Sequence, residues 1–240
     1  MNIFMWSGPR NLSTALMRSF ENREDTKVWD EPLYAYYLNE TKKDHPMFKE
    51  IIETYEININ KLTKKIVSTN KDKKIFYQKH MSHHILSQTP INWITKGTNV
   101  FLIRDPRDVI LSYIQKNTLN NSDDIGFPMQ RKLFNLIKDR GENPIVVNAD
   151  DLSTSPRDLL IKLCSKLKIK FSEKMLTWNK GKRDSDGIWE KVWYKNVQSS
   201  TNFEKLKKND QVIPKVHENI YKECLDVYNE LNLYKIKNAR

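Results

Sequence analysis

The chain has 240 residues, of which 38% are hydrophobic and 30% are charged, and its formal net charge is +11 at pH 7. This length can bury one sizeable core and predicts a single domain over residues 1–240. No apolar run approaches the length of a membrane span, so we expect no membrane partner. The two cysteines, both inside helical patterns, argue against a disulfide scaffold.

The positive charge invites a nucleic-acid hypothesis. Only ten of the 41 basic residues are arginine, however, and the lysines are scattered in pairs along the chain instead of forming one arm or stripe. Scattered lysines are typical of a solvated surface, so we expect no nucleic acid as partner. A non-catalytic nucleic-acid binder is kept as an alternative. The first apolar run begins at Asn2 and leaves no room for a secretion leader, which favours a cytoplasmic protein.

Short apolar runs alternate with helical patterns along the chain. Runs typical of strands occupy residues 2–6, 27–30, 73–79, 99–103 and 144–148. Helical patterns occupy residues 33–39, 41–70, 127–140, 158–167 and 212–233, and two more follow the first and fourth strands. This alternation predicts an α/β fold, a three-layer domain with a mostly parallel central sheet of about five strands.

The first fourteen residues, MNIFMWSGPRNLST, read as a strand, a tight loop and a helix whose first turn carries Arg10, Asn11, Ser13 and Thr14. A helix N-terminus offers unpaired N–H groups and the positive end of its dipole, so this turn predicts a phosphate site. The alternative is a capped helix after a buried strand. The loop is not a Walker A motif, because no Lys-Ser/Thr pair follows its glycine and Arg10 stands earlier in the loop.

Asp30 and Glu31 follow the second predicted strand, where α/β sheets place their ligand crevice. One of the two acids, Asp30, is also suited to cap the helix that follows. The third strand runs into His80, His83 and His84. Three histidines could suggest a metal, but no Cys or second acidic cluster accompanies them, so we expect no metal site.

The fourth strand ends in RDPRD. Helix-start signals account for Asp105, Pro106 and Asp108. They do not account for Arg104, a cation beside a helix N-terminus, where the dipole disfavours positive charge. A bound anion would resolve that conflict. A last dense basic loop, WNKGKR, occupies residues 178–183.

These motifs together resemble those of the sulfotransferases that use 3′-phosphoadenosine 5′-phosphosulfate (PAPS). The 5′-phosphosulfate loop of that family runs Pro-Lys/Arg-Ser-Gly-Ser/Thr-Thr, and it is matched here by Pro9, Arg10, Ser13 and Thr14, with departures at Asn11 and Leu12. The 3′-phosphate motif of the family has an Arg at a strand end and a Ser eight residues later, matched by Arg104 and Ser112. The resemblance extends over about residues 2–194 and implies a P-loop NTPase-like sulfotransferase fold.

The resemblance also implies roles for individual residues. The expected donor-binding residues are Arg10, Asn11, Leu12, Ser13, Thr14, Arg104, Ser112, Lys180, Gly181 and Arg183. Glu31 follows Arg10 by 21 residues, a spacing similar to that of the catalytic glutamate in protein-tyrosine sulfotransferases. The stretch Lys79-His80 is similar to the Lys-x-His segment of cytosolic sulfotransferases, without the intervening residue. We therefore expect Glu31 as the base and His80 as the second choice or a residue of the substrate pocket.

The expected reaction is metal-free, in-line transfer of a sulfuryl group from PAPS to a hydroxyl or amine, with 3′-phosphoadenosine 5′-phosphate (PAP) as product. Arg10 would stabilise the charge on the departing oxygen. We expect a small-molecule or glycan acceptor, although sugar, lipid, peptide and small alcohol acceptors all stay open, as does the oligomeric state. The alternative function is a nucleotide or small-molecule kinase of the same broad fold.

Overall fold

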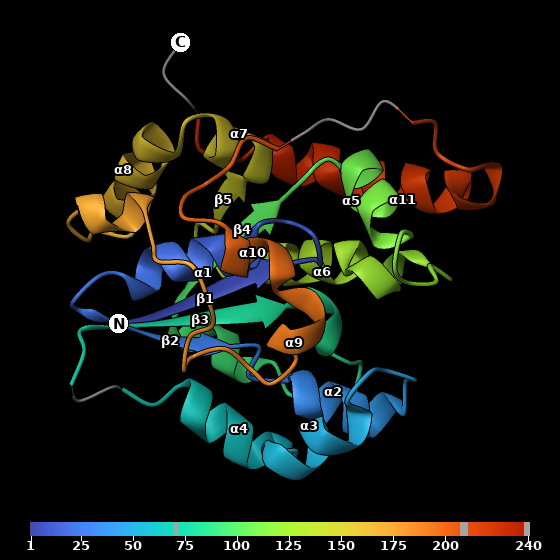
Figure 1. Ribbon diagram of the computed structural model, residues 1–240, viewed down its shortest axis with the longest axis horizontal. Helices are drawn as coiled ribbons and strands as arrows, with labels where there is room; N and C mark the ends of the chain where they lie inside the picture. Colours follow the sequence, from blue (N-terminus) through green and yellow to red (C-terminus); the bar gives the residue numbers. More distant parts are fainter. Residues whose placement is uncertain (70–71, 207–210, 238–240) are drawn as a thin grey trace.

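The computed structural model describes residues 1–69, 72–206 and 211–237. Five strands in these ranges form one sheet in which all neighbours are parallel, in the order β2-β3-β1-β4-β5 (Figure 1). The strands are β1 (Asn2–Ser7), β2 (Thr26–Asp30), β3 (Ile75–Met81), β4 (Thr98–Ile103) and β5 (Ile145–Asn148). Most strand residues are buried, as expected for a parallel sheet covered on both faces. The predicted α/β fold is confirmed.

Helices connect the strands and cover both faces of the sheet. The α-helices in the described ranges are α1 (Ser13–Glu21), α2 (Tyr34–Thr41), α3 (Phe48–Thr54), α4 (Ile59–Ile66), α5 (Pro106–Tyr113), α6 (Phe127–Asp139), α7 (Ala149–Thr154), α8 (Pro156–Lys166), α9 (Glu190–Trp193), α10 (Lys195–Ser199) and α11 (Glu218–Asn232). The 3₁₀ helices are η1 (Ser82–His84), η2 (Asn92–Lys96), η3 (Ser122–Ile125), η4 (Glu173–Leu176) and η5 (Lys215–His217).

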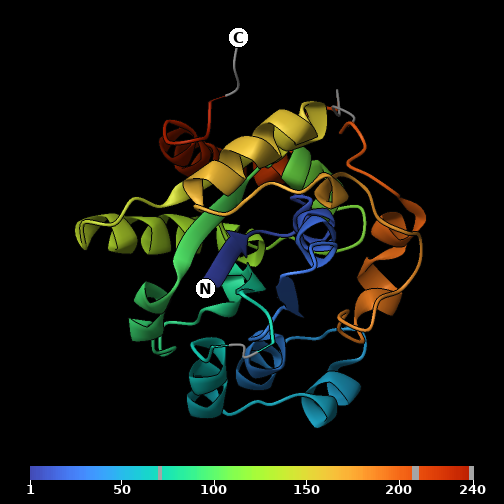
Figure 2. The same cartoon turned by 90° about the vertical axis from the view of Figure 1, so that its left-hand side faces the viewer.

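The sheet separates two hydrophobic cores. Successive side chains of a strand point to opposite faces, so in β1 Ile3 and Met5 pack against α1 and α8, while Phe4 and Trp6 enter the other core with α5, α6 and α11. Figure 2 shows the helices on both sides of the sheet. The protein is therefore three layers deep, as the alternating pattern predicts.

The strand order determines where a ligand can bind. β1 lies in the middle of the sheet, between β3 and β4. From β1 the chain crosses to the edge strand β2, returns to β3, and then continues to β4 and β5 on the other side of β1, where the direction of winding reverses. In open α/β sheets, ligands bind at the carboxyl ends of strands near such a reversal. The residues that follow β1, β2, β3 and β4 consequently meet at one edge of the sheet.

The predicted helix over residues 41–70 is interrupted. Met47 has a φ angle of 64° and Pro46 precedes it, so the first part of that segment lies outside α3. The chain re-enters a helix at α4, whose N-terminus is capped by the Asn58 side chain. The predicted helix over residues 212–233 begins only at Glu218 as α11, after Pro214 and the short η5. Pro46 and Pro214 each disfavour a helical conformation in the residue before them, which keeps His45 and Ile213 out of a helix.

Candidate active site

The loop between β1 and α1 has the backbone geometry of an anion site. Arg10 and Leu12 have φ angles of 65° and 63°, in the left-handed region. Such turns bring successive N–H groups into a concave, anion-binding arrangement. None of the described side chains caps the N-terminus of α1, so its first N–H groups and the positive end of its dipole are available to a ligand.

Gly8 lets this loop pass close to η3. A Cβ atom at Gly8 would lie 2.4 Å from the carbonyl oxygen of Ile125, closer than packed atoms approach. Any larger residue would push the loop away from η3 or distort it. The glycine therefore fixes the position of the loop that follows β1.

Three predicted anion-binding side chains come together beside this loop. The Nε atom of Arg10 donates to Ser112 Oγ at 2.9 Å, and Nη1 of Arg104 donates to the carbonyl oxygen of Arg10 at 2.8 Å. Burial lowers the pKa of both guanidinium groups, and the charge of Arg104 lowers the pKa of Arg10 further. Asp108 lies 3.8 Å from Arg104 and, with Asp105 and Asp150, opposes the lowering of the Arg104 pKa. An anion at this point would relieve the repulsion between the arginines.

Two buried polar atoms support the same interpretation. Arg104 Nε and Asn11 Oδ1 have no hydrogen-bond partner among the described residues. Leaving a buried donor without an acceptor costs about 1–3 kcal/mol. An oxygen of a bound phosphate or sulfate group would satisfy Arg104 Nε. The residues present thus fit an anionic group.

Glu31 lies at the same edge of the sheet, directly after β2. Lys79 Nζ, at the end of β3, is 2.8 Å from Asp30 Oδ1 and 2.9 Å from Glu31 Oε1. Both the Lys79 and Asp30 side chains are 1% exposed, and that of Glu31 is 10% exposed. Burial raises the pKa of the Glu31 carboxyl, Lys79 opposes that rise and Asp30 adds to it. Glu31 is therefore a carboxyl group with an increased tendency to hold a proton.

A later segment, which we call the strap (residues 183–194), closes over Asp30. Asp30 Oδ2 accepts hydrogen bonds from the Gly187 N–H group at 3.1 Å and from Trp189 Nε1 at 3.1 Å. The Tyr194 hydroxyl donates to Asp30 at 2.7 Å and 2.9 Å. Asp30 was a candidate cap for the helix after β2, but α2 begins only at Tyr34 and Asp30 instead holds the strap. Its four donors come from side chains and backbone that are remote in sequence.

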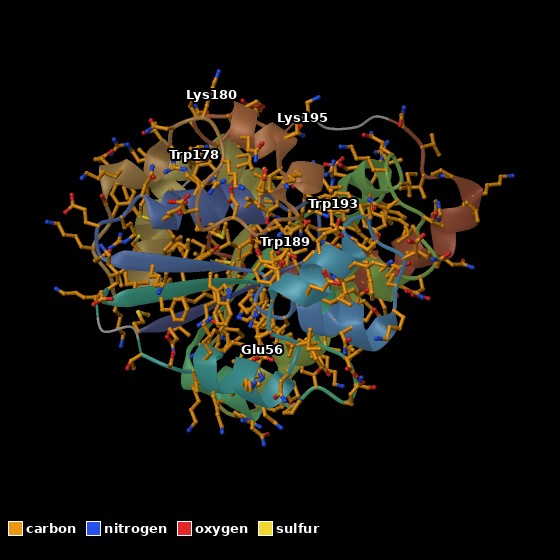
Figure 3. All side chains as sticks on the ribbon, turned by 60° about the horizontal axis from the view of Figure 1, so that its bottom comes forward. Glu56, Trp178, Lys180, Trp189, Trp193 and Lys195 are labelled. Atoms are coloured by element: carbon orange, nitrogen blue, oxygen red, sulfur yellow. The ribbon has the colours of Figure 1, made fainter. Side chains whose placement is uncertain are left out.

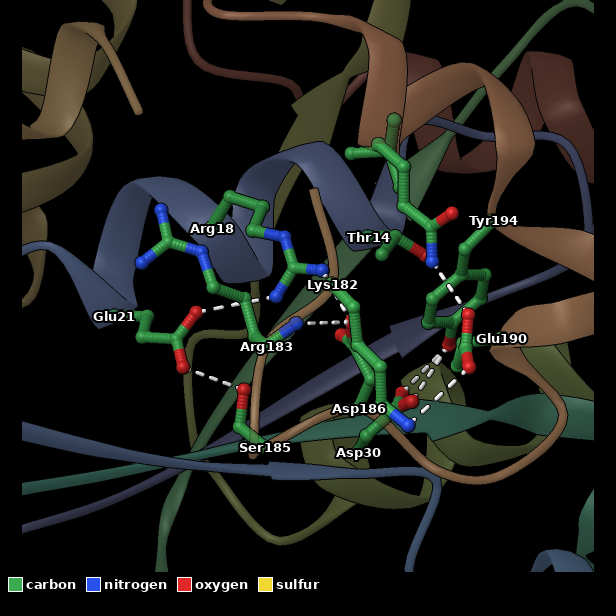
Figure 4. Close-up of polar contacts among 12 residues, drawn as sticks. Thr14, Arg18, Glu21, Asp30, Lys182, Arg183, Ser185, Asp186, Glu190 and Tyr194 are labelled. Atoms are coloured by element: carbon green, nitrogen blue, oxygen red, sulfur yellow. Dashed lines mark hydrogen bonds and ion pairs between the residues drawn. The ribbon is translucent and has the colours of Figure 1, made fainter. Parts of the chain in front are cut away.

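A second buried acid holds the other end of the strap (Figure 4). Arg18 Nη2, on α1, is 2.6 Å from Asp186 Oδ2, with side-chain exposures of 1% and 0%. The same carboxylate accepts the Arg183 N–H group at 2.8 Å, and Glu21 accepts from the Ser185 hydroxyl. The strap is thus fixed to α1 through Asp186 and to β2 through Asp30.

His84 approaches the other oxygen of Glu31. Its Nε2 atom lies 3.9 Å from Glu31 Oε2, and its ring stacks on Tyr34 and Tyr37 with centroid distances of 4.7 Å and 4.8 Å. Burial, together with the charge of Lys79 and the neighbouring histidines, keeps the pKa of His84 well below its usual value. His84 is therefore a neutral, aromatic neighbour of Glu31.

His80, the second choice for the base, lies on the opposite face of the sheet from Lys79. Its ring stacks on Trp6 at 4.7 Å and packs against Phe4 and Trp93. Neither ring nitrogen has a partner among the described residues, and burial lowers the pKa of His80 to about 3. A base must reach the proton that it accepts, so this placement argues against His80 as the base.

The basic loop is not joined to the anion site in this structure. Across the described residues, no hydrogen bond or ion pair connects Lys180, Gly181 or Arg183 with Arg10 or Arg104. Lys180 points outward, whereas Trp189 lies inside (Figure 3). The Gly181 N–H group donates to the Gln198 carbonyl at 2.8 Å. Donor binding by these three residues stays a prediction.

Sequence reasoning missed Lys79, Tyr194 and His84. The similarity of Lys79-His80 to the Lys-x-His segment directed attention to His80, not to Lys79. The pairing of Lys79 with the two acids depends on strand order, which cannot be read from one strand. Tyr194 reaches the site across 164 residues. Ser13 and Thr14 lie in the first turn of α1 as predicted, but Arg10 and Asn11, which we also expected there, precede the helix in a loop where Arg10 is left-handed. Thr14 Oγ1 accepts from Lys79 Nζ at 3.2 Å.

Other features of the described residues limit what the site contains. No group of three or more His, Cys, Asp or Glu side chains in these ranges has an arrangement that could hold a metal ion. None of the helices described is both long and apolar enough to cross a membrane. A hollow of about 610 Å³ lies along β2, and its lining includes Asp30 but not Glu31, Lys79 or Arg104.

Residues 1–233 match a family model described as a sulfotransferase domain, so the chain belongs to the sulfotransferase family. The match extends beyond residues 2–194, over which the motifs suggested a resemblance, and includes α11. The resemblance drawn from the two anion motifs is confirmed.

Two plant proteins are similar in sequence. Branched-chain-amino-acid aminotransferase-like protein 1 of Arabidopsis thaliana is 36% identical over 229 residues, 95% of this chain. Branched-chain-amino-acid aminotransferase-like protein 2 of the same plant is 34% identical over 232 residues, 97% of this chain. The chain spans 41% of the length of each of these proteins.

Solved sulfotransferase structures share the fold. The sulfotransferase domain of the Synechococcus PCC 7002 olefin synthase superimposes with a TM-score of 0.59 at 15% identity, covering 95% of this chain and 94% of that one. A sulfotransferase from Alicyclobacillus acidocaldarius superimposes with a TM-score of 0.54 at 8% identity, covering 98% and 96%. At these identities the likeness concerns the fold alone.

Proposed function

We propose that the protein transfers a sulfuryl group from PAPS to a hydroxyl or amine group of an acceptor. The observation that carries this proposal is the convergence of Arg10, Arg104 and Ser112 beside the uncapped N-terminus of α1. Two cations on separate strand ends suit a donor with phosphate groups at both its 3′ and 5′ positions. A carboxylate with a raised pKa, Glu31, lies at the same edge.

PAPS supplies an activated sulfuryl group, and the chain supplies positioning and charge. Arg10, Ser13 and Thr14 hold the 5′-phosphosulfate end, together with the N–H groups of Asn11 and Leu12. Arg104 and Ser112 hold the 3′-phosphate. Lys180, Gly181 and Arg183 are proposed to complete the nucleotide site.

Glu31 accepts the proton of the acceptor's hydroxyl or amine. General-base assistance of this kind contributes about 10²- to 10⁴-fold in rate. Arg10 stabilises the negative charge on the departing oxygen, since a fixed cation in a partly buried site acts without reorganisation. This division of roles parallels phosphoryl transfer, where positioning and electrostatics dominate.

Calorimetric titration with PAP, ADP and ATP, each with and without magnesium, tests the proposal. We expect PAP to bind at least tenfold more tightly than ADP, without dependence on magnesium, because only PAP places a phosphate on Arg104. A preference for Mg-ATP would overturn the proposal in favour of the kinase alternative. Transfer should then be sought by following PAP release from PAPS with a mixture of sugars, small alcohols and amines.

The finer statements about partners and location stay predictions. They are a small-molecule or glycan acceptor, the absence of a metal requirement, no nucleic-acid or membrane partner, a cytoplasmic location, and residues 1–240 as one sulfotransferase-like domain. Activity that survives EDTA would support the metal-free scheme, and metal-dependent activity would contradict it.

A further inference from the structure

We propose that Lys79 is a positioning residue for the catalytic base, holding the Glu31 carboxylate charged and oriented toward the loop that follows β1. This inference rests on the assignment of Glu31 as the base in the proposed function. Lys79 belongs neither to the 5′-phosphosulfate loop nor to the 3′-phosphate motif. The inference is based on the contacts that Lys79 makes with the end of β2, with α1 and with the strap.

The Lys79 ammonium group is enclosed by partners. It contacts Asp30 Oδ1 at 2.8 Å, Glu31 Oε1 at 2.9 Å and Thr14 Oγ1 at 3.2 Å, and it donates to the Tyr194 hydroxyl. A buried lysine without partners would lose its proton. Although burial opposes it, the charges of Asp30 and Glu31 raise the pKa of Lys79. The group is therefore a permanent cation at the centre of the site.

Its two carboxylates are not equivalent. Asp30 also accepts hydrogen bonds from Gly187, Trp189 and Tyr194. Glu31 has Lys79 as its one close cation among the described residues, and the Tyr194 hydroxyl is at the outer limit of a hydrogen bond, 3.5 Å away. Loss of Lys79 would thus leave Asp30 with three donors but would leave Glu31 almost without stabilisation of its charge.

The backbone adds a second link between the same residues. The Glu31 N–H group donates to the carbonyl oxygen of Lys79 at 2.9 Å, and Glu31 has a φ angle of 42°. A non-glycine residue in the left-handed region is strained and persists only where its surroundings impose it. Lys79 therefore holds Glu31 through both its main chain and its side chain.

Lys79 also connects the base to the donor loop. Thr14 belongs to the first turn of α1, where the anion is proposed to bind. A negatively charged donor arriving beside Thr14 would, by repulsion, favour protonation of Glu31. A permanent cation between them opposes that effect. Lys79 is thus placed to keep Glu31 unprotonated while the donor is bound.

The charged and titratable groups that face Glu31 come from every element around it. They are Asp30 of β2, Lys79 of β3, Tyr34 of α2, His84 of η1 and Tyr194 at the end of the strap. Only Lys79 carries a positive charge, since the pKa of His84 is depressed. Lys79 and Asp30 shift the proton affinity of Glu31 in opposite directions, and the experiment uses this opposition.

The experiment compares Asp30→Asn with the double variant Asp30→Asn/Lys79→Met. Removing Asp30 first avoids leaving two unpaired buried carboxylates, and the pair differs only at Lys79. The titration of the Glu31 carboxyl is followed by carbon-13 NMR of protein labelled at glutamate, with Glu31→Gln identifying the signal. In Asp30→Asn, we expect the midpoint of the Glu31 titration to lie at lower pH than in the wild type. In the double variant, we expect that midpoint at least one pH unit above its value in Asp30→Asn. That difference is a tenfold change in proton affinity.

Activity provides a second readout. The acid limb of the pH–rate profile for PAP release should move with the NMR midpoint, and Lys79→Arg should restore part of the wild-type profile. A purely structural role would lower the rate at every pH without moving the limb. Equal Glu31 midpoints in the two Asp30 variants would overturn the inference. If PAPS is not a donor but the midpoints differ, the proposed function fails and the link between Lys79 and Glu31 stands.

Discussion

The Nε atom of Arg10 donates a hydrogen bond to Ser112 Oγ at 2.9 Å, across 102 residues of sequence. This contact joins the loop after β1 to α5, which follows β4. It brings together the two family motifs, recognised separately in the sequence, at the proposed anion site. The contact joins residues that follow the central strand β1 and its neighbour β4, so its geometry depends on the order of the strands in the sheet.

The Arg104→Ala variant should bind PAP far more weakly while its affinity for ADP changes little. A hydrogen bond to a charged group contributes about 1.5–3 kcal/mol, which corresponds to roughly 10- to 150-fold in affinity. Calorimetry on both nucleotides measures the difference. Arg107→Ala is the matched control, because its guanidinium group donates to the Gln211 carbonyl. Equal losses for PAP and ADP would remove the 3′-phosphate role from Arg104.

The Glu31→Gln variant should lose turnover by about 10²- to 10⁴-fold and keep its affinity for PAP within a few fold. The amide has nearly the same shape as the carboxyl but cannot accept the acceptor's proton. Single-turnover release of PAP from PAPS measures the effect. Glu56→Gln, a change on an exposed carboxyl with one long ion pair to Lys61 at 3.5 Å, should leave turnover unchanged. An active Glu31→Gln variant would show that Glu31 is not the catalytic base.

The His80→Phe variant should retain turnover and be less sensitive to acid. The pKa of His80 is lowered to about 3 in the folded protein, from about 6.5 when unfolded. A lowered pKa means that its contribution to stability is complete above about pH 6.5 and is lost as the pH falls toward 3. Between pH 6 and 4, the free energy of unfolding should fall with decreasing pH in both proteins. The slope for the variant should be smaller than that for the wild type by about 1.4 kcal/mol per pH unit.

Denaturant unfolding at several pH values measures this slope. An unchanged slope would mean that His80 accepts a proton in the folded state. Abolished turnover in a well-folded His80→Phe variant would restore His80 as a candidate base.

Breaking the Arg18–Asp186 pair should destabilise the protein strongly. Both side chains are almost completely buried, and removing one partner of such a pair leaves an uncompensated charge that costs about 3–5 kcal/mol. We expect that loss for Arg18→Met in chemical denaturation. The double variant Arg18→Met/Asp186→Leu should recover much of it, because the orphaned charge is gone. Additive losses in the double variant would show that the pair is not energetically coupled.

Local sequence rules account for the parts of the site that lie on one segment. Asp105 accepts the Arg107 N–H group and Pro106 begins α5, as the helix-start signals predict. The conflict at Arg104, a cation set against the dipole of the adjacent helix, predicts an anion, and the buried Nε atom without a partner supports that prediction. The strand periodicity likewise predicted all five strands to within two residues at each end.

The remaining parts depend on relationships that no single segment contains. Lys79 reaches Asp30 and Glu31 only because β3 pairs with β2, and that pairing follows from the strand order. Asp30 had a local interpretation as a helix cap, yet its partners are on the strap. His80 and Lys79 are neighbours in sequence but face opposite sides of the sheet. Their place in the sequence therefore could not show that His80 lies in the core and Lys79 in the candidate site.

The strap also constrains how the protein is made. Asp30 and Tyr194 are 164 residues apart, and Arg18 and Asp186 are 168 apart. At ribosomal rates of about 5–20 residues per second, the second member of each pair emerges roughly 8 to 34 seconds after the first. During that interval Arg18, Asp30 and Lys79 cannot be buried with their full set of partners. The carboxyl edge of the amino-terminal half of the sheet must therefore stay hydrated until Tyr194 has been synthesised, and only then can the candidate site close.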